Sequence, residues 1–328
     1  MTKIGGTGGS ALELLKRLLQ AREALILIIV LIIGITLSFM SEFFLTPGNI
    51  QAVLLGLSVE AIIAAGMMIL MISGGFDLSV GSTMALAGMI CSLLLDPIGV
   101  FPAILAGLTI AVLVGVVNGS MVAFVGVNPF VATLAMMSIA RGLVFIITEG
   151  RPTVGLRSDF TALGQGNLFG IQLPIIYMVV IMVIAGILLA NFSFFKQNYY
   201  MGGNEKAARF SGIQVNKIKI INYIIVAALA GLAGIIHTAR VGVGAVTTGT
   251  GSELRVISAV VIGGASLSGG EGTILGAFLG TLLMALITNA LNLLGVSVYW
   301  QQFIIGVVLA LAVVVDTIGK RRRAAVKT

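Results

Sequence analysis

Two stretches of the sequence, residues 97–140 and 272–315, contain no Asp, Glu, Lys or Arg over 44 residues each. Across the 328 residues, 58% are hydrophobic and 9% are charged. Soluble domains carry about 25% charged residues, and a chain with far fewer cannot solvate its surface. One crossing of the hydrocarbon core takes about 20 apolar residues. The chain is therefore predicted to be an all-α integral membrane protein that crosses the membrane many times.

Positive charge gathers in three places. Of the 19 Lys and Arg residues, 14 lie in residues 1–22, 196–219 and 320–327. Because cytoplasmic segments of membrane proteins are enriched in Lys and Arg, all three are predicted to be cytoplasmic. The net charge of +7 is then explained by topology and gives no reason to expect nucleic acid as a partner.

Ten spans fit the apolar segments best, because with both termini on one side the number must be even. They are expected near residues 24–40, 50–72, 78–95, 101–125, 130–148, 174–195, 219–240, 250–267, 273–295 and 299–315. The first is an uncleaved span, since no small-residue cleavage site follows it. The chain thus divides into a cytoplasmic N-terminal segment (1–23), a transmembrane domain (24–316) with a cytoplasmic loop (196–218), and a basic cytoplasmic tail (317–328).

Two glycine-rich segments resemble each other. Residues 74–81 read GGFDLSVG and residues 263–270 read GGASLSGG, with five identities in eight. Paired Gly-interrupted segments in two halves of a membrane protein are typical of broken or re-entrant helices that face a permeation path. Asp77 and Ser79 are therefore candidates for lining the path or for capping a helix start. Chance similarity of two glycine turns, in a chain with 43 Gly, is the alternative.

The other polar groups expected in the membrane are mostly neutral. Amides and an aromatic ring suit an uncharged polyhydroxylated solute, although amides also hold helices together in any bundle. The further candidates for the path are Asn118, Asn128, Asn289, Asn292 and Trp300.

Two charged residues, Glu60 and Arg141, are expected near the middle of spans. Ionised groups there are costly unless they are paired. We expect these two to pair with each other. The alternative is that each is satisfied separately by water or by loop carbonyls.

Enzyme chemistry has little support in the sequence. The chain has one Cys (Cys91) and one His (His237), so neither a disulfide nor a Cys/His metal site is expected. No nucleophile with its base is evident, and no Gly-x4-Gly-Lys-Ser/Thr phosphate loop occurs. We predict no cofactor, and any ATP hydrolysis must come from a separate subunit. An ion-coupled secondary transporter, with Glu60 or Asp77 as the coupling group, remains a rival.

The predicted cytoplasmic loop contains a short helix signal at residues 202–213, GGNEKAARFSGI. Asn204 can cap the helix, Glu205 lies favourably at its positive end, and Gly212 suits a left-handed stop. Such a helix suits a docking element for a soluble partner. A solvated connector is the other interpretation of the same pattern.

This loop resembles the coupling segment of bacterial ATP-binding-cassette importer permeases of the monosaccharide branch, such as ribose, xylose, galactose and arabinose permeases. Further segments of residues 43–316 are similar to that family, with Phe76 where Ile is usual and Arg255 where Asp is usual. These segments are 74–82 (GGFDLSVGS), 133–142 (TLAMMSIARG), 249–254 (GTGSEL), 263–276 (GGASLSGGEGTILG) and 289–296 (NALNLLGV).

The resemblance implies a permease subunit in the cytoplasmic membrane of a bacterium, surrounded by lipid. Its partners would be a second permease copy, identical or paralogous, a cassette ATPase, and an extracytoplasmic sugar-binding protein. The cargo would be a monosaccharide such as ribose or a similar pentose or hexose; a polyol, a signalling sugar or a branched-chain amino acid is the alternative. The residues that would dock into the ATPase are Gly203, Asn204, Glu205, Ala207, Ala208 and Gly212.

Overall fold

The computed structural model describes residues 22–325, so residues 1–21 and 326–328 of the predicted cytoplasmic ends lie outside it. Most of the described chain is helical. The elements are α2 (Arg22–Met40), α3 (Pro47–Ile72), α4 (Val80–Ile98), α5 (Val100–Ser120), the π-helical turn η1 (Met121–Val125), α6 (Pro129–Thr148), α7 (Ser158–Gln165), β1 (Asn167–Leu168), β2 (Ile171–Gln172), α8 (Leu173–Asn191), α9 (Ser193–Gly203), α10 (Glu205–Phe210), α11 (Val215–Val241), α12 (Ser252–Ile262), α13 (Ile274–Leu293) and α14 (Val298–Ala325).

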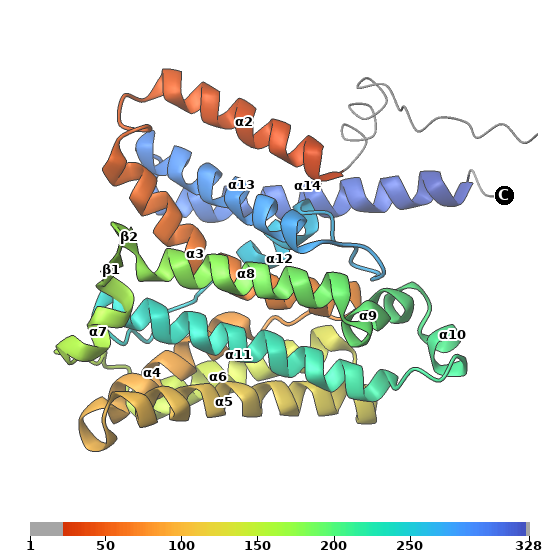
Figure 1. Cartoon of the computed structure of the whole chain (residues 1–328), viewed down its shortest axis with the longest axis horizontal. Coiled ribbons are helices and arrows are strands. Elements are labelled where there is room, and N and C mark those ends of the chain that lie inside the picture. The colour runs from red at the N-terminus through yellow and green to blue at the C-terminus, as the bar shows by residue number, and fades with distance from the viewer. Residues whose placement is uncertain (1–21, 326–328) are drawn as a thin grey trace, which may run out of the picture.

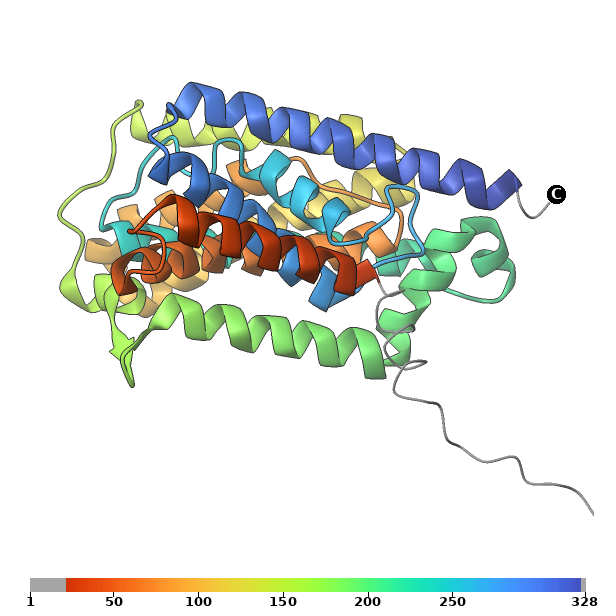
Figure 2. The same cartoon turned by 90° about the horizontal axis from the view of Figure 1, so that it is seen from above.

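The long helices run side by side along one axis (Figures 1 and 2). Within residues 22–325, eight helical segments are long and apolar enough to cross a membrane: α2, α3, α4, α5 with η1, α6, α8, α11 and α13. Helix α14 contains a shorter apolar stretch, Tyr299–Val314. The prediction of an all-α polytopic membrane protein is confirmed.

The span predicted at residues 250–267 is wrong as a continuous membrane helix. Helix α12 has only 11 residues, whereas a crossing takes about 20. Residues 263–273 continue from it without helix toward the end of the bundle that carries α9 and α10 (Figure 1). Residues 73–79, between α3 and α4, are also non-helical. Both Gly-rich segments are therefore non-helical: residues 73–79 join the spans α3 and α4, and residues 263–273 follow the short helix α12. We call these two segments the breaks.

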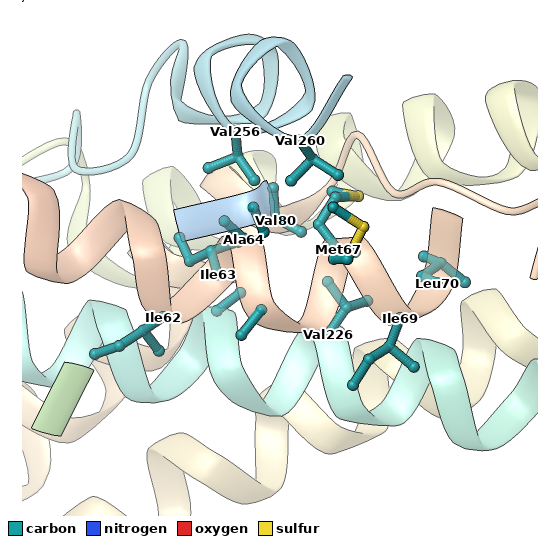
Figure 3. Packing of buried hydrophobic residues seen from close by; sticks show 14 of the residues in the cluster. Ile62, Ile63, Ala64, Met67, Ile69, Leu70, Val80, Val226, Val256 and Val260 are labelled. Carbon is teal, nitrogen blue, oxygen red and sulfur yellow. The ribbon is translucent and has the colours of Figure 1, made fainter. Parts of the chain in front are cut away.

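Helix α3 forms the centre of the bundle, and its second half is almost completely buried. Figure 3 shows Ile63 and Met67 of this helix among Val226 of α11 and Val256 and Val260 of α12. Because lipid is as apolar as these side chains, close van der Waals packing stabilises the arrangement.

Glycine permits the closest approaches between helices. A Cβ atom on Gly276 would clash with the carbonyl oxygen of Gly263, and one on Gly280 with that of Ala259. Gly115 of α5 lies in the same way against the backbone of α11. These glycines therefore allow direct contact between neighbouring backbones.

The two ends of the bundle differ. One end carries α7 and the β1–β2 hairpin, which pairs Asn167 with Gln172 and Leu168 with Ile171 in antiparallel register. The other end carries α9, α10, the start of α2 and the last turn of α14 (Figures 1 and 2). We call these the hairpin end and the loop end. By the distribution of positive charge, the loop end is the one predicted to be cytoplasmic.

Candidate functional site

Helix α10 at the loop end is built as its sequence predicted. The Asn204 side chain accepts a hydrogen bond from the backbone N–H of Ala207 at 3.0 Å and so caps the helix. Gly212, just after the helix, has a φ of +82°, a left-handed conformation that favours glycine. Both the predicted cap and the predicted stop are confirmed.

Glu205 ties this helix to the start of α11. Lys219 Nζ and Arg209 Nη2 donate hydrogen bonds to its two carboxylate oxygens at 2.8 and 2.9 Å. Burial raises the pKa of the Glu205 carboxyl, but the hydrogen bonds from Lys219 and Arg209 outweigh burial and hold it below its usual range. Glu205 is therefore ionised at neutral pH, and the ion pairs fix the angle of the helix.

Helix α10 turns Ala208 inward and Phe210 outward. Ala208 is 3% exposed and packs with Met201, Val215 and Ile218, so it faces the helix bundle. Phe210, by contrast, is 92% exposed. Sequence reasoning missed Phe210, although an aromatic residue between Arg and Ser in a cytoplasmic loop was a signal for an interaction surface.

The two breaks, residues 73–79 and 263–273, meet beside the last turn of α9. Gly270 N–H donates a hydrogen bond of 2.8 Å to the carbonyl oxygen of Ile72. Gly202, in the last turn of α9, fits between them so closely that a Cβ atom there would clash with the same carbonyl. Tyr199 OH donates to the carbonyl oxygen of Gly272 at 2.8 Å. We call this contact of α9 with the two breaks the glycine junction.

Three of the predicted path residues come together in a closed cluster. Asp77 Oδ1 accepts hydrogen bonds from the N–H and the hydroxyl of Ser79, at 2.7 and 2.6 Å. Asn118 Nδ2 donates to Asp77 Oδ2 at 3.2 Å and to Ser79 Oγ at 3.0 Å. All three residues are fully buried. The cluster fastens the first break to α5. Ser79, the N-cap residue of α4, makes no cap hydrogen bond through its side chain.

The remaining candidates lie apart from that cluster. Asn128 caps α6, its side chain accepting from Phe130 N–H at 2.9 Å. Trp300 is 60% exposed and packs edge-on against Phe303, with ring centroids 5.6 Å apart. Asn289 and Asn292 line a cavity of about 330 Å³ between α3, α12, α13 and α14. This hairpin-end cavity is also lined by Ala52, Val53, Gly56, Glu60, Arg255, Ala285, Thr288, Gln301, Gln302 and Ile305.

The predicted pair of Glu60 and Arg141 is wrong. Glu60 Oε1 accepts a hydrogen bond from Arg255 Nε at 2.5 Å, because α12 lies beside α3. Arg141 lies on α6, beside α4 and the loop before α12, and donates to the carbonyl oxygens of Val246 and Thr248 at 2.6 and 3.0 Å. Arg255, which stands where the family that the sequence resembles usually has Asp, is thus the partner of Glu60.

Reversing the Glu60–Arg255 pair tests this assignment. Glu60→Arg or Arg255→Glu alone places like charges together, and we expect each to destabilise the fold by about 3–5 kcal/mol. The double reversal is expected to recover most of the lost stability. Thermal unfolding of the detergent-purified proteins measures the effect, and a double variant no more stable than the single ones contradicts the pairing.

Comparison with known proteins identifies the family. Residues 49–313 match the family model of the branched-chain amino acid transport system permease component. The chain belongs to this permease family. It is 40% identical over 306 residues to the ribose import permease protein of Escherichia coli (strain K12), covering 92% of this chain and 95% of that protein. No solved structure matches.

Two further relatives cover similar lengths of the permease. The ribose import permease protein of Bacillus subtilis (strain 168) is 40% identical over 294 residues, 87% of this chain and 89% of that protein. The L-arabinose ABC transporter permease protein of Azospirillum brasilense is 38% identical over 307 residues, 92% of this chain and 89% of that protein. The permease is thus similar to sugar permeases along almost its whole length.

Proposed function

We propose that the protein is the permease subunit of an ATP-driven, binding-protein-dependent importer of a monosaccharide, ribose or a similar pentose or hexose, in a bacterial inner membrane. The near full-length similarity to the ribose import permease carries this proposal. An uncharged polyhydroxylated cargo agrees with the neutral amides of the hairpin-end cavity. A polyol, a signalling sugar or a branched-chain amino acid is the second choice of cargo.

The ATPase would be coupled to the permease through α10. The sequence contains no phosphate loop, and in this proposal a separate cassette ATPase supplies the energy. The proposed docking surface consists of the exposed part of the loop, with Gly203, Ala207 and Phe210 outward and Asn204, Glu205 and Gly212 holding the helix in shape. Ala208 would not touch the ATPase; its buried side chain would hold the helix against the permease.

The other partners follow from the direction of transport. An extracytoplasmic sugar-binding protein would dock at the hairpin end, opposite α10. Two permease copies, identical or paralogous, would rock between outward-open and inward-open states as the ATPase domains close. The Lys219–Glu205 ion pair links α10 to α11, which would help to pass movement of a docked ATPase to the helices.

Gentle purification from the native membrane tests the proposal. We expect mass spectrometry of the tagged complex to find a cassette ATPase, together with a binding protein that carries a monosaccharide. A purified permease without an ATPase, still moving solute in vesicles along a proton or sodium gradient, would contradict it and favour a secondary transporter.

A further inference from the structure

Small residues on two helices leave room in the hairpin-end cavity. Ala52 and Gly56 of α3 and Ala285 of α13 are among its lining residues. A Cβ atom on Gly56 would meet nothing within 4 Å, so the space beside this glycine is open. The cavity lies between four helices and is partly open to the outside, so a ligand can enter it.

The cavity also contains the Glu60–Arg255 ion pair. The two side chains are 18% and 23% exposed, so both remain partly open to the cavity. Buried ion pairs are often no more stabilising than apolar side chains of the same volume, and charged residues within membrane domains are usually functional. One negative and one positive charge cancel, which makes the lining polar without net charge.

The hydrogen-bonding groups around the pair are held in place. Asn289 Nδ2 donates to Asn49 Oδ1 at 2.7 Å, and Gln301 Nε2 donates to Asn292 Oδ1 at 2.8 Å. Arg255 Nη2 donates to Ser252 Oγ at 2.9 Å, which orients the guanidinium. Fixed amides, a carboxylate and a guanidinium offer both acceptors and donors to the hydroxyl groups of a sugar.

Volume limits the class of ligand. Sites for small molecules measure about 300–1,000 Å³, and this cavity, at about 330 Å³, lies at the lower limit. It suits one neutral ring with several hydroxyl groups. A peptide or a lipid chain would need a longer or more apolar space.

We propose that the hairpin-end cavity is a binding site for the monosaccharide during transport, in which Glu60 and Arg255 make charge-assisted hydrogen bonds to its hydroxyl groups. This inference rests on the proposed function, and it assigns the permease itself a share in selecting the sugar. Because the lining has no net charge, the site favours neutral sugars over sugar acids and amino sugars.

Filling the cavity tests the proposal. Gly56→Leu places an isobutyl group in the open space, and Gly48→Leu is the matched control on the same helix, where a Cβ atom also meets nothing within 4 Å. The whole transporter, with ATPase and binding protein, is reconstituted in vesicles, and uptake of D-ribose, L-arabinose and D-allose is measured with complex assembly. We expect Gly56→Leu to lower uptake about tenfold or more, because leucine occupies the site, and Gly48→Leu to match the parent.

A second variant covers the case in which Gly56→Leu does not assemble. Replacing both charges, Glu60→Gln with Arg255→Gln, keeps the lining neutral and leaves no unpaired ion. We expect the KM for the sugar to rise about tenfold while ATP hydrolysis continues.

The outcomes separate the two proposals. A Gly56→Leu transporter that imports at the parental rate, or a double variant with an unchanged KM, overturns the binding site while the proposed function stands. A parent transporter that imports none of the three sugars contradicts the proposed function before the variants are compared.

Discussion

Gly202→Ala is expected to abolish uptake while the permease still inserts and still binds its ATPase. The added Cβ atom would clash with the carbonyl oxygen of Ile72 and the N–H of Gly270, which are backbone atoms that cannot rotate away. Such overpacking costs about 1–3 kcal/mol, and α9 must shift away from both breaks to relieve it. The glycine junction would then no longer transmit movement of the coupling loop. Radiolabelled ribose uptake and ATPase co-purification measure the two parts of the result.

The matched control is Gly186→Ala in α8, the helix that leads into α9. A Cβ atom there meets nothing within 4 Å, so uptake should remain at the parental level. Tyr199→Phe is a milder test of the same junction, since it removes only the hydroxyl that donates to Gly272. Normal uptake by Gly202→Ala would mean that the junction plays no part in coupling.

Phe210→Ala is expected to weaken ATPase binding by about 2 kcal/mol or more, which is about thirtyfold in Kd. An aromatic side chain that is 92% exposed contributes little to the fold of the isolated permease, so stability and insertion should not change. In a complex, the same ring supplies a large rigid anchor for a groove on the partner. Titration of the purified ATPase against permease in nanodiscs measures the affinity.

Phe169→Ala serves as the control for Phe210. Phe169 is 94% exposed in the β1–β2 turn at the hairpin end, so its removal should leave the ATPase affinity unchanged. Equal affinities for Phe210→Ala and the parent would place the docking surface elsewhere on the loop end.

Local sequence signals predicted local structure well. The cap at Asn204 and the turn at Gly212 depend on a few neighbouring residues, so the sequence of the loop was enough to predict them. The two breaks were predicted for the same reason, because glycine clusters interrupt apolar segments. That the breaks touch each other and α9 depends on packing between distant parts of the chain, and no local pattern shows it.

The sequence did not predict which residues from distant parts of the chain contact each other across the bundle. Glu60 was paired with Arg141 because both are charges expected in mid-span, but α12 lies beside α3 and brings Arg255 to it. Phe210 was missed because the buried face of a six-residue helix depends on which side packs against α11.

The central claim is that ATP hydrolysis on a docked ATPase drives import through this permease. The most direct measurement is ribose uptake into proteoliposomes that contain permease, ATPase and binding protein. Uptake is compared with ATP alone, with ATP and vanadate, and with ATP and ionophores. We predict uptake that requires ATP and the binding protein, stops with vanadate, and is unchanged when proton and sodium gradients are dissipated. Uptake that persists with vanadate and disappears with the ionophores would contradict the claim.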